Sequence, residues 1–312
     1  LGIHTTFFGQ GRLPQRPITA YLRELTKKGI TFDYHNTMPF TIDGKLRSGV
    51  FELEGDVSSQ YVTGLLFALP LLDGDSEIRM LSKLESKPYV DLTIACLRHF
   101  GIAVQETEQG YAVAGGQQYH ACDLTVEGDY SQAAFFCVAN ALGSDITLTN
   151  LNPESVQGDK KIVEIVREMC YNREQGLPAG FTVDAADIPD LVPILAVLAT
   201  FGTAPSSITG AHRLAIKESD RLASTADLLN RLGGKVTATP DGLEIEPVKQ
   251  LHGGTVDSCG DHRIAMCAAV AATRCAGEVT ILHGECVEKS YPRFYEDYRQ
   301  LGGIANVIVL ES

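Results

Sequence analysis

The sequence repeats a segment of about seventy residues, and this repeat constrains the fold more than any single motif does. Each copy begins with a short acidic turn, continues through an apolar helix rich in Ala and Leu, and reaches a short β-branched strand. The four turns begin at Gly55, Gly128, Asp187 and Gly260. A repeat of this length is typical of a supersecondary unit that buries its apolar face against neighbouring copies.

The apolar helices are predicted at residues 61–72, 132–142, 191–201 and 264–273, and the strands that follow them at 77–80, 146–151, 207–209 and 279–282. A second, amphipathic helix then follows in each copy, at 89–100, 160–170, 221–232 and 292–301. Leu-Gly-Gly ends the last two of these helices, as expected where a helix stops at a residue with positive φ. The strand pair 235–239 and 243–246, joined by Asp241-Gly242, completes a βαβαββ unit.

The opening residues match only the second half of such a unit, with a helix at 18–28, a stop at Gly29 and strands near 31–34 and 40–42. A repeat that begins halfway leaves its apolar face uncovered, so we expect a preceding segment to be missing or supplied separately. The predicted fold class is α/β (α+β), built from repeated βαβαββ units.

Composition limits the kinds of ligand that the chain can bind. Among its 312 residues the formal net charge is −13, which disfavours a nucleic-acid partner, and 44% of the residues are hydrophobic, enough for a sizeable core. No apolar run approaches the roughly 20 residues that cross a membrane. The eight cysteines show no CxxC spacing, so neither zinc nor any other metal is expected. Any anionic ligand must therefore be held by a local cluster of cations.

Cations recur at the predicted helix starts, where the helix dipole disfavours them. The polar turns are Gln15-Arg16-Pro17, Ser58-Ser59-Gln60, Ser86-Lys87-Pro88-Tyr89, Ile188-Pro189-Asp190, Lys217-Glu218-Ser219-Asp220-Arg221, Asp261-His262-Arg263 and Glu288-Lys289-Ser290. A sequence breaks a local rule of this kind mainly where function requires it. An anion bound between the dipole and the cation would remove the conflict.

Five of these strings carry a specific resemblance. In this order along the chain, they are similar to the motif series of the 5-enolpyruvylshikimate-3-phosphate (EPSP) synthases: Gly55-Asp56-Val57-Ser58-Ser59-Gln60, Ser86-Lys87-Pro88-Tyr89, Ile188-Pro189-Asp190, Lys217-Glu218-Ser219-Asp220-Arg221 and Asp261-His262-Arg263-Ile264-Ala265-Met266. The similarity extends over essentially the whole chain.

The resemblance implies an inverse-barrel arrangement of two lobes, whose helix N-termini face a cleft that closes on the substrates. Residues 1–120 would be the N-terminally incomplete first lobe and residues 121–312 the second. The implied activity transfers the enolpyruvyl group of phosphoenolpyruvate to the 5-hydroxyl of shikimate 3-phosphate and releases phosphate, in the shikimate pathway of aromatic amino acid biosynthesis. The implied protein is a cytoplasmic monomer with no cofactor, no metal and no membrane or nucleic-acid partner.

The resemblance also assigns residues to the two substrates. Shikimate 3-phosphate would bind Ser58, Ser59, Gln60, Ser86, Tyr89, Asp190 and Lys217. Phosphoenolpyruvate would bind Arg16, Gln60, Arg221, Arg263 and Lys289. This division is chemically sensible, because arginine offers a planar fork to carboxylate and phosphate, whereas hydroxyl and amide groups fix orientation.

The implied mechanism is addition followed by elimination through a tetrahedral intermediate, which needs a proton donor and a proton acceptor beside one carbon. By the resemblance Glu218 is the acid and Asp190 the base. Because Lys217 and Arg221 would tend to keep Glu218 ionised, Lys289 is an alternative proton carrier.

Simpler explanations exist for each motif taken alone. Ile188-Pro189-Asp190 suits an ordinary helix start, Ser58 and Ser59 suit N-caps, and Asp129 and Asp261 are expected to brace turns. His262 is given no catalytic role.

The sequence also departs from the family at two places. A lysine-serine pair and an asparagine-glycine loop lie in the family upstream of where this chain begins, so we expect an incomplete site. Residues 211–215 differ from the usual forms, which puts one substrate contact in doubt. Two alternatives remain: the sister enzyme that acts on UDP-N-acetylglucosamine, and a non-catalytic scaffold of the same fold.

Overall fold

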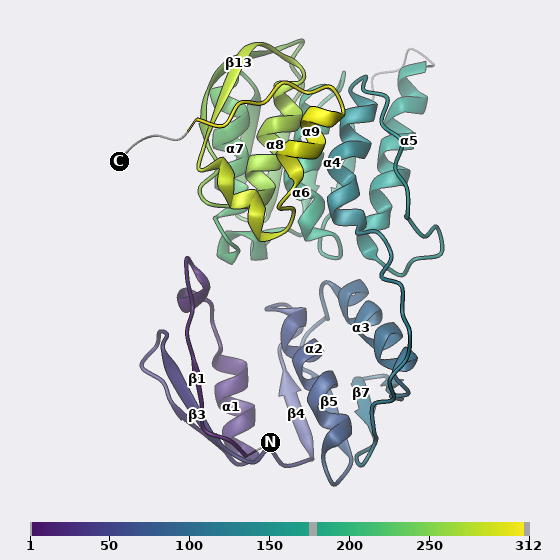
Figure 1. Ribbon diagram of the computed structural model, residues 1–312, viewed down its shortest axis with the longest axis vertical. Coiled ribbons are helices and arrows are strands. Elements are labelled where there is room, and N and C mark those ends of the chain that lie inside the picture. Colours follow the sequence, from purple (N-terminus) through teal and green to yellow (C-terminus); the bar gives the residue numbers. More distant parts are fainter. Residues whose placement is uncertain (1, 175–179, 309–312) are drawn as a thin grey trace. The chain divides into compact units, whose positions relative to one another are not determined.

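The computed structural model describes residues 2–174 and 180–308, with the side chains of 170–174 excepted. The chain divides into two compact units (Figure 1). The first unit holds residues 1–126 and 156–158, and the second holds 127–155 and 159–312. In the described part of the chain, no helix is both long enough and apolar enough to span a bilayer.

The first unit contains one complete copy of the predicted repeat. In chain order its elements are β4 (Val50–Leu53), α2 (Ser59–Ala68), the 3-10 turn Leu69–Leu71, β5 (Ser76–Met80), α3 (Lys87–His99), β6 (Gln105–Thr107) and β7 (Gly110–Val113). The strands form a sheet in the order β4-β5-β7-β6. Strand β4 pairs in parallel with β5, whereas β5 and β7, and β7 and β6, pair antiparallel. The predicted βαβαββ unit is therefore confirmed.

The second unit contains another complete copy with the same sheet topology. Its elements are β8 (Thr182–Asp184), the 3-10 turn Pro189–Leu191, α6 (Val192–Thr200), β9 (Ser206–Thr209), the 3-10 helix His212–Ile216, α7 (Arg221–Arg231), β10 (Lys235–Thr239) and β11 (Gly242–Glu246). The strand order is β8-β9-β11-β10, with β8 parallel to β9 and both other pairs antiparallel. Gly233 ends α7 with φ 89°, and the amide of Gly234 donates to the carbonyl of Leu229.

Two further groups of elements are halves of the same unit. The first unit opens with β1 (Thr5–Phe7), the 3-10 turn Leu13–Gln15, α1 (Thr19–Lys27), β2 (Ile30–Asp33) and β3 (Phe40–Gly44), in a sheet of order β1-β3-β2. The second unit ends with β12 (Leu251–Asp257), α8 (His262–Ala272), β13 (Cys275–Leu282), the 3-10 helix Gly284–Lys289 and α9 (Phe294–Gln300), with β12 parallel to β13. The expectation that the opening residues match the second half of a βαβαββ unit is confirmed.

The copy that begins at Gly128 has its two helices, α4 (Tyr130–Ala141) and α5 (Lys161–Glu174), with a 3-10 turn at Gly158–Lys160 between them. The strand predicted at residues 146–151 is wrong, because these residues do not lie in a β-strand. The side-chain amide of Asn140 bonds both the N–H and the carbonyl of Ile146, as that of Asn230 does with Val236 at the start of β10. The carbonyl of Asn150 accepts from the amide of Gly128 at 2.7 Å.

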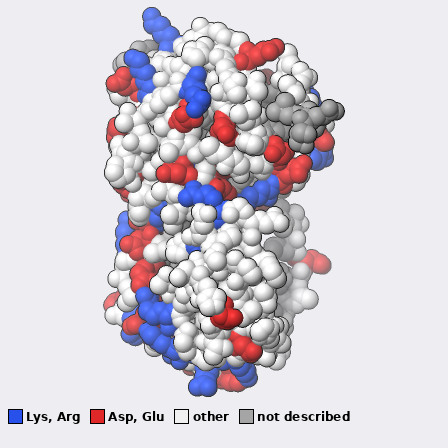
Figure 2. Space-filling model, turned by 90° about the vertical axis from the view of Figure 1, so that its left-hand side faces the viewer, with Lys and Arg blue, Asp and Glu red and all other residues white. Residues whose placement is uncertain are grey.

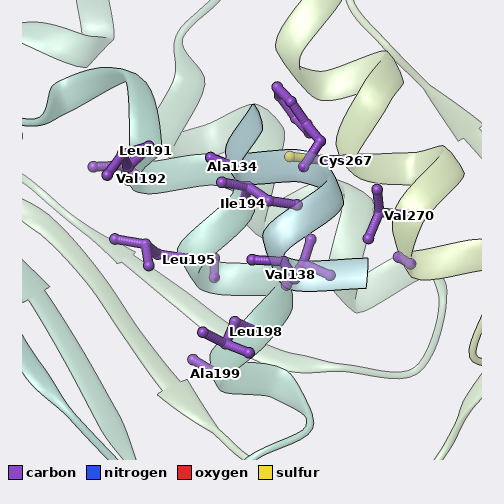
Figure 3. Packing of buried hydrophobic residues seen from close by; sticks show 14 of the residues in the cluster. Ala134, Val138, Leu191, Val192, Ile194, Leu195, Leu198, Ala199, Cys267 and Val270 are labelled. Atoms are coloured by element: carbon purple, nitrogen blue, oxygen red, sulfur yellow. The ribbon is translucent and has the colours of Figure 1, made fainter. Parts of the chain in front are cut away.

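Three helices make up the centre of the second unit. Every residue of α6 is buried, as are ten residues of α8 and eight of α4. Figure 3 shows their side chains packed together, with Ile194 and Leu198 of α6 near Val138 of α4 and Val270 of α8. Helices that are apolar all round belong inside a protein, so the Ala- and Leu-rich runs of the repeat are explained by this core. The first unit has a separate core formed around α2, β4 and β5.

The positions of the polar turns in the second unit follow from its parallel strand pairs. Strands β8 and β9 run in the same direction, so their carboxyl ends lie at the same edge of the sheet. The turns that follow lead into α6 and α7, and the parallel pair β12 and β13 likewise leads into α8 and the 3-10 helix before α9. Helix N-termini and the polar residues before them are therefore gathered where the strands end.

Candidate active site

The guanidinium of Arg221 lies at the centre of a charged cluster in the second unit. Its Nε is 2.8 Å from Asp261 Oδ2, Nη1 is 2.9 Å from Asp190 Oδ1, and Nη2 is 2.9 Å from Glu218 Oε2. The side chain is only 2% exposed although it carries a full charge. Three carboxylates from different turns of the repeat satisfy it, so Arg221 joins the turns before α6, α7 and α8.

Arg263 makes the second link to Asp190. Its Nη2 lies 2.9 Å from Asp190 Oδ2 and also donates to Ser131 Oγ at 3.0 Å. The backbone amide of Arg263 donates to Oδ1 of Asp261, which caps α8. Asp190 thus has one carboxylate oxygen on each of two arginines, which holds its side chain in a fixed orientation.

Lys289 reaches the same cluster through Glu218. Its Nζ donates to Glu218 Oε1, while the other oxygen of that carboxylate accepts from Arg221. The lysine side chain is 54% exposed, against 18% for Glu218. Lys289 is therefore the solvent-facing member of the cluster.

The charges in the cluster fix the protonation of its carboxylates. Burial by itself would raise the pKa of Asp190, but Arg263, Arg221 and Lys217 outweigh it and lower that pKa to about 2. Burial acts in the same way on Glu218, and Arg221 and Lys289 hold its pKa below the ordinary value. Both carboxylates are ionised at neutral pH.

His262 lies beside the cluster, in the first turn of α8. Burial, and then the charge of Arg263, lower its pKa to about 4. The imidazole is consequently neutral at neutral pH. Among the residues that the structure describes, no group of His, Cys, Asp and Glu could hold a metal ion.

The cluster contains more positive than negative groups. Its cations are Lys217, Arg221, Arg263 and Lys289, and its carboxylates are Asp190, Glu218 and Asp261. The N-termini of α7 and α8 add the positive ends of their dipoles. The chain as a whole carries a net charge of −13, so this excess is a local property of the cluster. On the face shown in Figure 2, acidic and basic side chains are interspersed. Such a site suits a small, highly charged anion.

In the first unit, the predicted ligands lie at the starts of α2 and α3. Ser58 caps α2 by accepting from the amide of Gln60, and Ser59 is buried in the first turn. Ser86 lies immediately before α3 with φ 57° and is 2% exposed, and Tyr89 is in the first turn of that helix. Because β4 and β5 are parallel, these two helix starts lie at the same edge of their sheet.

Arg16, the remaining predicted ligand, precedes α1. It follows the 3-10 turn Leu13–Gln15, and its amide donates to the carbonyl of Leu13 at 3.1 Å. The described structure therefore brings Asp190, Glu218, Arg221, Arg263 and Lys289 together in the second unit, with Lys217 beside them. It places Arg16 and the serine-bearing turns in the first unit.

Comparison with known proteins supplies the decisive observation. Residues 1–298 match the family profile of EPSP synthase (3-phosphoshikimate 1-carboxyvinyltransferase). The chain belongs to the EPSP synthase family.

Relatives of the family agree over almost the whole chain. The 3-phosphoshikimate 1-carboxyvinyltransferase of Clostridium kluyveri is 44% identical, and the match covers 97% of this chain and 74% of that protein. That of Clostridium acetobutylicum is 43% identical, with 96% and 72% covered. An EPSP synthase structure from Acinetobacter baumannii superposes with a TM-score of 0.76 at 25% identity, covering 96% of this chain and 74% of that one. The enolpyruvyl transferase NikO of Streptomyces tendae, at 17% identity and a TM-score of 0.69, shares the fold.

Two polar contacts of this EPSP synthase family member were not predicted from its sequence. Ser131 accepts from Arg263, and Ser219 donates to Asp261 at 3.2 Å. Ser131 occupies the same place after its Gly-Asp turn as Arg263 does in the fourth copy, so alignment of the repeats would have indicated it. The bracing role expected of Asp261 is confirmed by its bonds to Arg221 and to the start of α8.

The low pKa of Asp190 predicts how stability depends on pH. Because its pKa falls from 3.8 to about 2 on folding, ionised Asp190 stabilises the folded chain above about pH 4, and this contribution is lost as the pH falls toward 2. We expect Asp190→Asn to flatten the pH dependence of the free energy of unfolding in that range, measured by urea denaturation. Parallel curves for the variant and the parent chain would contradict this origin of the shift.

Proposed function

We propose that this chain catalyses transfer of the enolpyruvyl group of phosphoenolpyruvate to the 5-hydroxyl of shikimate 3-phosphate, with release of phosphate. The observation that carries the proposal is the cluster around Arg221, in which cations from two copies of one unit surround two ionised carboxylates. Family membership and relatives at 40–44% identity support this substrate pair over UDP-N-acetylglucosamine. A scaffold that had lost activity would not be expected to keep such a cluster.

The two substrates are assigned to different groups of residues. We propose that phosphoenolpyruvate binds Arg16, Gln60, Arg221, Arg263 and Lys289, and that shikimate 3-phosphate binds Ser58, Ser59, Gln60, Ser86, Tyr89, Asp190 and Lys217. The arginines suit the planar carboxylate and the phosphate of phosphoenolpyruvate. The serine-bearing helix starts offer hydroxyl and backbone donors, which suit the phosphate and ring hydroxyls of the acceptor.

Asp190 is the proposed proton acceptor. Its carboxylate is ionised and held in a fixed orientation by Arg221 and Arg263, so it can take the proton of the 5-hydroxyl as the oxygen attacks. Protonation of the phosphoenolpyruvate methylene makes the adjacent carbon electrophilic and gives a tetrahedral intermediate. Loss of phosphate and of one methyl proton then restores the enol ether.

Lys289 is the proposed proton donor to the methylene group. Glu218, the acid suggested by the resemblance, has a lowered pKa and bonds to both Arg221 and Lys289, which supports a role as an ionised partner. The ammonium of Lys289 carries transferable protons and is the exposed member of the cluster. Glu218 would then hold the ammonium in place.

We further propose a cytoplasmic monomer that needs no cofactor or metal and has no membrane or nucleic-acid partner. The net charge of −13 supports the last point, because a phosphate backbone would be repelled except at local basic clusters.

Isothermal titration calorimetry with each substrate tests the proposal, with a substitution of Arg263 as the variant. We expect Arg263→Ala to weaken phosphoenolpyruvate binding in the presence of shikimate 3-phosphate by about 2 kcal/mol, and to change shikimate 3-phosphate binding much less. Arg263→Lys is the matched control, since it keeps the charge and loses the fork; we expect an intermediate loss. Equal losses for both substrates would contradict the assignment of Arg263, and no binding of either substrate to the parent chain would favour a scaffold.

A further inference from the structure

Two tyrosines join the start of α1 to the start of α2 in the first unit. The hydroxyl of Tyr61, on α2, donates to the carbonyl of Pro17, two residues before α1 begins. The hydroxyl of Tyr21, on α1, donates to the carbonyl of Tyr61 at 2.8 Å. The ring centroids are 4.9 Å apart with the planes inclined at 51°. Each helix thus bonds to backbone at the beginning of the other.

The contact is buried, and its fit depends on a glycine. Tyr61 is only 8% exposed, and burial raises the pKa of its hydroxyl, so the group remains a neutral donor. A Cβ at Gly64, one turn further along α2, would lie 2.3 Å from the hydroxyl oxygen of Tyr21. The absence of a side chain at this position lets the two helices approach closely enough for both bonds.

The bond to Pro17 restrains the residue immediately before it. Pro17 has its φ fixed by the ring, and a residue that precedes proline is confined to extended conformations. Arg16 has φ −68° and ψ 136°, and its amide is bonded to Leu13. Because few backbone conformations are allowed for Arg16 and Pro17, one hydrogen bond to the Pro17 carbonyl is enough to fix the position of the Arg16 backbone.

We propose that Tyr61 is a positioning residue for phosphoenolpyruvate, because its hydroxyl fixes the backbone of Arg16 relative to Ser59 and Gln60, its neighbours on α2. The inference rests on the proposed function, in which Arg16 and Gln60 both bind phosphoenolpyruvate. Tyr61 touches neither substrate in this scheme. Its effect is to hold Arg16 and the first turn of α2 in a fixed relative position, so that phosphoenolpyruvate binding does not carry the entropy cost of ordering them.

Steady-state kinetics of Tyr61→Phe tests the inference. The variant keeps the ring and removes the one donor, so we expect KM for phosphoenolpyruvate to rise about tenfold, while kcat and KM for shikimate 3-phosphate stay within about twofold. Tyr119→Phe is the matched control, because the Tyr119 hydroxyl donates to a carbonyl of the same helix, that of Phe67, at 2.8 Å. Because Tyr119 is 38% exposed, we expect the control to lose less free energy of unfolding and to keep the parent KM values.

Arg16→Ala completes the test as a double-mutant cycle. Arg16→Ala alone should raise KM for phosphoenolpyruvate, and adding Tyr61→Phe to it should change that KM by less than about twofold, since nothing remains to be positioned. The inference is overturned if Tyr61→Phe leaves this KM unchanged while Arg16→Ala raises it, or if the two effects multiply in full. If Arg16→Ala itself leaves KM unchanged, the assignment of Arg16 in the proposed function fails first, and the role of Tyr61 fails with it.

Discussion

Asp190→Asn should lower kcat by roughly 10²- to 10⁴-fold, the range expected when a general base is removed. The amide has nearly the same shape as the carboxylate but cannot take the proton of the attacking hydroxyl. It also removes the negative charge that pairs with Arg221 and Arg263. The measurement is the rate of phosphate release at saturating concentrations of both substrates.

Asp227→Asn is the matched control for this prediction. Asp227 lies on α7 in an exposed ion pair with Arg231, and we expect its loss to change kcat by less than about twofold. If Asp190→Asn keeps more than a tenth of the parent kcat while its fold is intact, Asp190 is not the base.

Arg221→Met should destabilise the second unit by about 3–5 kcal/mol. The substitution keeps most of the buried volume but leaves Asp190, Glu218 and Asp261 without their shared cation. Asp261 is fully buried, so water cannot replace the lost partner there. Urea denaturation followed by circular dichroism measures the loss.

Arg231→Met, at the other end of the same helix, separates this effect from a general loss of charge. Its side chain is 57% exposed and pairs with Asp227, and we expect a change within about 0.5 kcal/mol. Arg221→Lys should recover part of the stability, because one ammonium cannot reach three carboxylates. A loss below about 1 kcal/mol for Arg221→Met would show that the cluster is not what stabilises this end of the unit.

The repeat architecture was predictable because it rests on patterns within each copy. The hairpin of β10 and β11 follows from alternating residues around Asp241-Gly242, and the end of α7 follows from the positive φ that Gly233 permits. The helix starts that carry Ser58, Asp190 and Arg263 were also predicted, since capping residues and proline signal them locally.

The sequence patterns could not predict the contacts between turns that lie far apart in the chain. The bond from Arg221 to Asp261 spans forty residues and that from Arg263 to Asp190 spans 73, so no local rule selects these partners. The strand expected at 146–151 from its β-branched residues is not formed. The side chain of Asn140 bonds both backbone groups of Ile146, but Asn230 bonds Val236 in the same way and Val236 lies in β10, so this contact does not account for the difference.

The contrast in exposure between Arg221 and Lys289 has a consequence for motion during turnover. Arg221 is 2% exposed and bonded to three carboxylates, so it cannot change rotamer without breaking these bonds. The Lys289 side chain is 54% exposed and, among the ion pairs of the described residues, is bonded only through its ammonium to Glu218, so once that bond opens it can change rotamer in picoseconds to nanoseconds. In the proposed reaction, Arg221 would keep the charges around the substrates fixed, and Lys289 would be the residue that moves as it delivers a proton and takes up another from solvent.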